Sequence, residues 1–99
     1  MAIQLELAWS ERKRRDNLRR HGLDFVDAAQ VFAGVTFSCE DDRFAYGERR
    51  FVTLGFLEDV VVSIVHTEIV EEEWHRIRVI SFRKATRHEQ AIFFESLEN

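Results

Sequence analysis

The residues best suited to chemistry are the cations of segment 76–88, which contains no acid. Its basic side chains and its one histidine are Arg76, Arg78, Arg83, Lys84, Arg87 and His88. On a strand, Arg76 and Arg78 project from the same face about 7 Å apart, which suits two neighbouring phosphate oxygens. The segment therefore predicts a phosphate-binding surface. The alternative is a solvated strand face whose charges only provide polar cover.

Strict alternation along residues 73–83 predicts which side chains of this strand share a face. It groups Phe82 with the first two arginines and places Arg83 on the opposite face. Arg83, Lys84 and Arg87 then come at the turn into a predicted helix, whose positive N-terminal end adds to their field.

Proton transfer needs a different side chain, and the preceding strand offers one. His66 and Glu68 share a face of that strand, and a histidine, titrating near pH 6.5, can serve as acid or base at about neutral pH. The alternative is a histidine satisfied within the sheet. His21 precedes the helix-ending Gly22 at the negative end of a helix dipole, which by itself explains a histidine there.

A second basic segment covers residues 12–20, with six basic side chains and one acid, Asp16. The cations are Arg12, Lys13, Arg14, Arg15, Arg19 and Arg20. Acids cluster elsewhere, at 40–42 and 71–73, so the net charge of −4 hides two basic regions. Leu18 is the only apolar residue inside this segment, which predicts a helix that lies on the surface and has a narrow contact face.

The hydrophobic pattern predicts one domain over residues 1–99, with five strands and three helices. The expected strands are 3–9, 35–39, 50–57, 60–68 and 73–83, and residues 69–72 form an acidic loop. The first helix begins after Ser10, the second runs from Asp24 to Gly34, and the third begins at Thr86 with Glu89 completing a capping box. Helices gathered before a meander of strands indicate an α+β fold.

The composition also excludes several functions. The four histidines and Cys39 have no metal-site spacing, and the four glycines form no nucleotide-binding loop. One cysteine excludes an internal disulfide, and no apolar run approaches the roughly 20 residues of a membrane span. The N-terminus lacks the pattern of a signal peptide. We therefore expect a cytoplasmic protein without metal, cofactor or membrane contact.

Four segments, in the right order along the chain, resemble the BrnT family of toxins. They are NLRRHGLDF at 17–25, YGERRF at 46–51, HTE at 66–68 and RIRVISFRKAT at 76–86. The resemblance implies a RelE-like α+β fold, with two N-terminal helices packed on an antiparallel sheet and a C-terminal helix. It also implies a metal-independent endoribonuclease that inhibits translation and growth. The implied partners are RNA and a BrnA-like antitoxin, which alone would contact DNA, with a dimer possible in the toxin–antitoxin complex.

The resemblance implies roles for the matching residues. Those implied for catalysis are His66, Glu68, Arg78 and Arg83. Those implied for substrate binding are Arg49, Arg76, Lys84, Arg87 and His21. Two alternatives stay open: a non-catalytic subunit that binds an antitoxin, and a nucleic-acid-binding module that uses the 12–20 helix without cleavage.

Overall fold

The computed structural model describes residues 4–42, 45 and 47–98 of the chain. Ile3 and Tyr46, which entered the predicted first strand and the second family motif, lie outside the described residues. The elements are β1 (Gln4–Ala8), α1 (Glu11–His21), the 3-10 helix η1 (Phe25–Asp27), α2 (Ala28–Phe32), β2 (Thr36–Asp41), β3 (Arg50–Leu57), β4 (Val60–Val70), β5 (Trp74–Lys84) and α3 (Arg87–Leu97). The predicted α+β class is confirmed, and so are the five strands, the first helix and the C-terminal helix. The second predicted helix is a 3-10 turn followed by a short α-helix.

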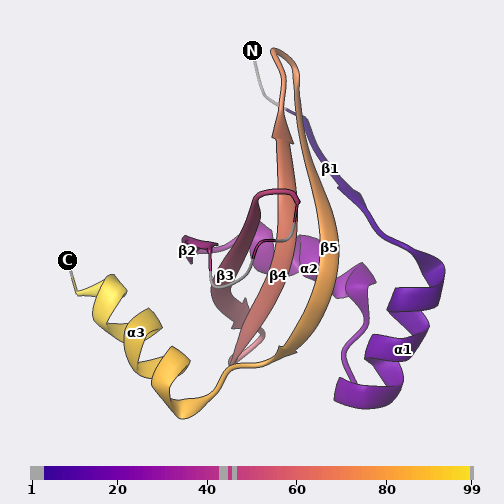
Figure 1. Cartoon of the computed structure of the whole chain (residues 1–99). Coiled ribbons are helices and arrows are strands. Elements are labelled where there is room, and N and C mark those ends of the chain that lie inside the picture. The colour runs from indigo at the N-terminus through magenta and orange to yellow at the C-terminus, as the bar shows by residue number, and fades with distance from the viewer. Residues whose placement is uncertain (1–3, 43–44, 46, 99) are drawn as a thin grey trace.

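The strands form one sheet in the order β1-β5-β4-β3-β2 (Figure 1). Strands β2 to β5 pair antiparallel, as predicted, whereas β1 lies parallel to β5. The expectation of an antiparallel sheet is therefore wrong for the first strand. Alternation reveals that a segment is a strand, but it carries no information on the direction of a distant partner.

The helices divide unequally between the two faces of the sheet. η1 and α2 cover one face, which we call the helix-covered face, and bury the main core there (Figure 1). This core consists of Phe25, Ala28, Val31, Val62, Ile64, Ile77, Val79 and Phe82. On the opposite face α3 packs mainly against β2 and β3, and Phe93 clusters there with Leu54, Val61 and Ala85.

The pairing of β4 with β5 contains a bulge that changes which side chains face the core. Val65 pairs with Ser81 but His66 pairs with Val79, so Ile80 is an extra residue on β5. Beyond the bulge the alternation is inverted, because two residues of one strand oppose one of the other. Phe82 is fully buried in the core, and Arg83 points to the opposite face. The face assignments predicted for Phe82 and Arg83 are therefore wrong.

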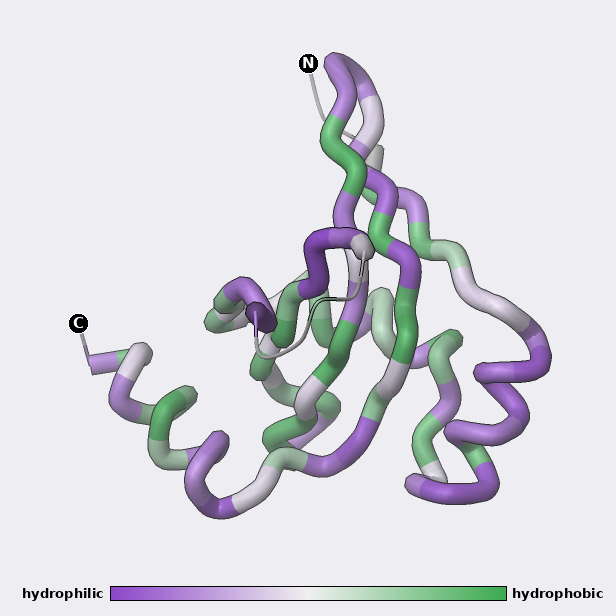
Figure 2. The backbone as a smooth tube through the Cα atoms, in the orientation of Figure 1, coloured by the Kyte–Doolittle hydropathy of each residue, from purple (hydrophilic) through white to green (hydrophobic). Residues whose placement is uncertain are grey.

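The acidic segment between β4 and β5 is a tight turn and not a loop. The Glu71 N–H donates to the Trp74 carbonyl at 2.8 Å, and β4 continues as far as Val70. The two strands form a long hairpin that projects beyond β2 and β3, and β1 flanks its outer part (Figure 1). Ile69 and Val70 are exposed on this projection, and the turn itself is hydrophilic (Figure 2).

The helix ends follow the predicted capping residues. The Ser10 side chain accepts from the Lys13 N–H, and Gly22 ends α1 with a φ of 70°, a conformation that glycine adopts readily. Thr86 and Glu89 form the predicted capping box of α3. Within the described residues, no helix is long and apolar enough to cross a membrane.

One buried side chain fixes α1 against the sheet. The Asn17 amide donates to the Phe82 carbonyl at 2.7 Å and accepts from the Phe82 N–H at 3.0 Å. Since β1 pairs with β5 only as far as Arg78, Phe82 lies on a free strand edge. Asn17 therefore supplies the hydrogen bonds that a neighbouring strand would have made.

Candidate functional site

The bulge in β5 places three arginines on one face of the sheet. Arg76 and Arg78 alternate with the buried Ile77 and Val79, and Arg83 joins them after the extra residue. Their side chains remain 51%, 44% and 35% exposed. We call this surface the arginine face. All three side chains come from a single paired strand, which holds their spacing rigid.

Carboxylates bind the arginines of this face. The Nη2 group of Arg78 donates to both oxygens of Glu48 at 2.9 Å, and Glu48 also lies 3.4 Å from Arg50. Arg83 forms a two-pronged pair with Glu89, at 2.8 and 3.0 Å. A carboxylate and a phosphate present similar oxygens to a guanidinium group, so these pairs mark positions where phosphate oxygens can bind.

Glu48 and Arg50 are parts of this surface that sequence reasoning did not single out, and Glu89 was predicted only as a helix-capping residue. Arg50 shares its parity with Val52 and Leu54 on β3, so alternation could have placed it. Glu48 gave no such signal, because it precedes the strand. Partial burial alone would raise the pKa of Glu89, but Arg83 and the N–H at Thr86 lower it below its ordinary value.

Two other predicted substrate contacts lie away from the arginine face. Arg49 pairs with Glu40 at 3.0 Å and lies over the Phe51 ring, 5.4 Å from its centre. The same pairing lowers the pKa of Glu40. Lys84 pairs with Val62 in the register and lines a cavity with Leu23 and Leu57 on the helix-covered face. The structure therefore does not bring these two cations to Arg78 and Arg83.

His66 lies in the core, on the helix-covered face, and none of it is exposed. Its ring stacks near Phe51 and meets Phe32 edge-on, and its Nε2 lies 2.6 Å from the Thr53 hydroxyl. Glu68 is beside it, 3.6 Å from His66 Nδ1 and 3.2 Å from His75 Nε2. The prediction that His66 and Glu68 share a face is confirmed, but the sheet separates them from the arginines. Nothing in this geometry lets His66 transfer a proton on the arginine face.

The burial of His66 has a measurable consequence for stability. Burial lowers the pKa of His66 below its ordinary 6.5, although the neighbouring Glu68 opposes this shift. Below pH 6.5 the unfolded chain therefore binds a proton that the folded chain resists. We expect stability to be complete above that pH and to fall as the pH drops, by up to about 1.4 kcal/mol per pH unit. Urea unfolding between pH 7.5 and 5.5 measures this slope.

The matched variants for this test are His66→Gln and His88→Gln. Glutamine at position 66 removes the titrating group and keeps an amide that can hydrogen-bond Thr53. The stability of His66→Gln should therefore depend less steeply on pH than that of the wild type. His88 lies exposed on α3, so His88→Gln is the control for losing a histidine outside the core. Equal slopes for wild type and His66→Gln would contradict the assignment.

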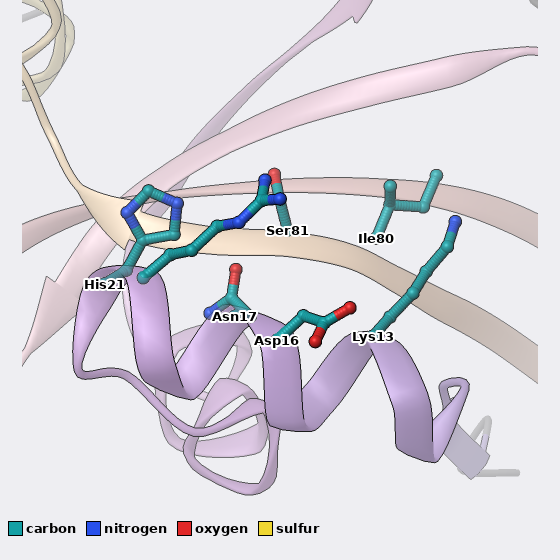
Figure 3. Close-up of a pocket in the computed structure, with 7 residues that line it drawn as sticks. Lys13, Asp16, Asn17, His21, Ile80 and Ser81 are labelled. Carbon is teal, nitrogen blue, oxygen red and sulfur yellow. The ribbon is translucent and has the colours of Figure 1, made fainter.

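A second concave surface lies where α1 runs beside the free edge of β5. It encloses about 200 Å³, and its lining is Lys13, Asp16, Asn17, Arg20, His21, Ile80 and Ser81. Figure 3 shows the side chains of α1 directed toward Ile80 and Ser81. His21, a predicted substrate contact, is therefore in this groove, away from the buried His66. Arg87 lies exposed in the first turn of α3.

Together, the fold and this site define a class: a small α+β domain that presents a row of guanidinium groups on one sheet face. Among the described residues, no group of three His, Cys, Asp or Glu side chains is placed to hold a metal ion. The chain belongs to the BrnT family, because residues 9–89 match the family model described as ribonuclease toxin, BrnT, of type II toxin-antitoxin system. This match confirms the resemblance found in the sequence. A comparison with curated proteins finds no match.

Proposed function

We propose that this chain cleaves RNA on the arginine face, without a metal ion, and that it inhibits translation and growth in the cytoplasm. A BrnA-like antitoxin would neutralise it and supply the DNA contacts of the complex, and the fold would be RelE-like. The observation that carries the proposal is the bulge in β5, which puts Arg83 on the same face of the sheet as Arg76 and Arg78. The family match supports the reaction type.

The reaction we propose is attack of a 2′-oxygen on the adjacent phosphorus. A bond forms between these two atoms, and the bond from phosphorus to the 5′-oxygen breaks. The 2′-hydroxyl loses its proton to a base, and the leaving 5′-oxygen takes a proton from water. The products are a 2′,3′-cyclic phosphate and a 5′-hydroxyl. The phosphorane carries extra negative charge, which fixed guanidinium groups stabilise more strongly than they stabilise the substrate.

Residue roles follow from the ion pairs. Arg78 and Arg83 would bind the reacting phosphate after displacing Glu48 and Glu89, and Arg76 would bind the strand beside it. A displaced Glu48 carboxylate remains close to the phosphate bound by Arg78, so it is our candidate for the base. His66 and Glu68, buried or paired on the other face, are not given this role.

Purified protein should cut RNA in buffer that contains a metal chelator, with or without added ribosomes. The fragments should end in a cyclic phosphate and a 5′-hydroxyl, and induced expression should arrest growth. Intact RNA under both conditions, together with normal growth on expression, would show that the proposal is wrong.

A non-catalytic antitoxin-binding subunit is the second candidate. The pairing of Arg78 and Arg83 with carboxylates favours it, because an anionic substrate must break both pairs. Growth separates the two, since a subunit that only binds an antitoxin leaves growth unaffected.

A further inference from the structure

We propose that the groove between α1 and β5 is a second binding site for the RNA strand. It binds the phosphodiester that neighbours the cleaved phosphodiester in the same strand. This inference rests on the proposed function and extends it, because it assigns a second RNA subsite outside the arginine face. The ligand is single-stranded RNA backbone, recognised by its phosphate and ribose.

The two walls of the groove differ in chemistry. The α1 wall carries Lys13, Arg20 and His21, which would contact an anion, and the β5 wall carries Ile80 and the Ser81 hydroxyl. Ile80 and Ser81 are half-buried. A phosphate can bind the cations and the hydroxyl while its ribose lies against Ile80. Figure 3 shows Lys13 and His21 at opposite ends of the groove, with Asn17 between them.

A phosphate meets less competition from carboxylates at the cations of the groove than at those of the arginine face. Within the described part of the chain, neither Lys13 nor Arg20 has an ion-pair partner. The one acid in the lining, Asp16, pairs with Arg19. A phosphate can therefore bind Lys13 and Arg20 without displacing a carboxylate, whereas at Arg78 and Arg83 it must displace one.

The groove is continuous with the proposed site of cleavage. Ser81 pairs with Val65, whose side chain lies on the arginine face, and it precedes Arg83 by two residues, or about 7 Å along the strand. The two hydrogen bonds between Asn17 and Phe82 hold α1 against this part of β5. An RNA strand bound in the groove therefore extends directly onto the arginine face.

The size of the groove favours RNA over a segment of an acidic protein. At about 200 Å³ it is smaller than the roughly 300–1,000 Å³ of pockets that enclose a drug-sized ligand. It therefore suits one phosphate with its ribose and not a helix or strand of a partner. The rest of an RNA strand would lie on the adjoining arginine face.

The test compares two double variants that each remove two positive charges from α1. Lys13→Ala with Arg20→Ala removes the groove cations. Arg12→Ala with Arg15→Ala removes two exposed cations that do not line the groove. The probe is a short fluorescent RNA with 2′-O-methyl groups, which cannot be cleaved by 2′-oxygen attack, and its binding is followed by anisotropy at several salt concentrations.

We expect the groove variant to bind at least about 10-fold more weakly and its salt slope to fall by about 0.7 per lost phosphate contact. The control variant should change affinity by less than about threefold, because distant exposed charges are screened. Asp16→Asn should strengthen binding, since it removes the one acid of the lining.

Equally weakened RNA binding in the two double variants would overturn the inference, because it would show that net charge and not the groove determines the affinity. So would tight binding of a labelled Asp/Glu-rich peptide by the wild type with no binding of the RNA probe. If the wild type cleaves RNA and the groove variant binds normally, only this inference fails. If the wild type binds the probe through the groove but cleaves no RNA, the proposed function fails and the subsite stands.

Discussion

Replacing Arg78 by alanine should lower the rate of RNA cleavage by about 10²–10³, the usual effect of removing one fixed group that stabilises a transition state. Arg78 should have this effect because it projects from the centre of a paired strand, and its guanidinium group donates to both carboxylate oxygens of Glu48. The loss should appear mainly in kcat, since the charge that Arg78 stabilises develops in the phosphorane. Single-turnover cleavage of a defined RNA measures it.

Two further variants make this result specific. Arg78→Lys keeps the charge but loses the planar fork, and it should restore part of the activity. Arg15→Ala removes an exposed arginine of α1 and should leave cleavage within about twofold of the wild type. The same ranking is expected for growth arrest on expression. An Arg78→Ala protein that is folded and fully active would exclude this residue from the reaction.

Replacing Phe82 by alanine should reduce the free energy of unfolding by about 3–5 kcal/mol. The bulge turns this ring into the core, where none of it is exposed and where it packs among the residues around Ile64 and Val79. Strict alternation places the ring beside Arg76 and Arg78, where its loss would cost little. The measurement therefore tests the register that also positions Arg83. Urea unfolding at pH 7.5 gives the value.

The matched control is Phe94→Ala, the same change at a position of α3 that is 46% exposed. It should cost clearly less, about 1 kcal/mol, because much of that ring already contacts water. The total stability of a small domain is only about 5–15 kcal/mol, so the Phe82→Ala protein could fail to fold. Phe82→Leu, expected to cost about 1–1.5 kcal/mol, then provides the comparison. Equal losses at positions 82 and 94 would contradict the register.

The ion pairs on the arginine face bear on how an active protein would be controlled. Glu48 and Glu89 bind the guanidinium groups that a phosphate must reach, so RNA competes with carboxylates of the chain itself. Such exposed or partly exposed pairs are each worth only about 0–1 kcal/mol. A polyanion that makes several contacts at once can displace them, whereas a single small anion gains little from doing so.

The sequence by itself determined the secondary structure closely, because its signals are local. Ser10, Gly22, Thr86 and Glu89 begin and end helices through hydrogen bonds and backbone conformations that involve only nearby residues. The alternation of apolar residues located every strand to within a few positions. The family was also evident, since its four motifs lie in order along the chain and the family model matches residues 9–89.

Only the tertiary structure decided which side chains meet. The direction of β1 depends on a partner about 70 residues away, and the bulge at Ile80 depends on the register in which β4 and β5 pair. That single extra residue moved Arg83 to the arginine face and Phe82 to the core. Burial of His66 beneath Phe32 likewise depends on where α2 packs. Periodicity describes one strand at a time, whereas a site is formed by the register between strands and by the helices that cover them.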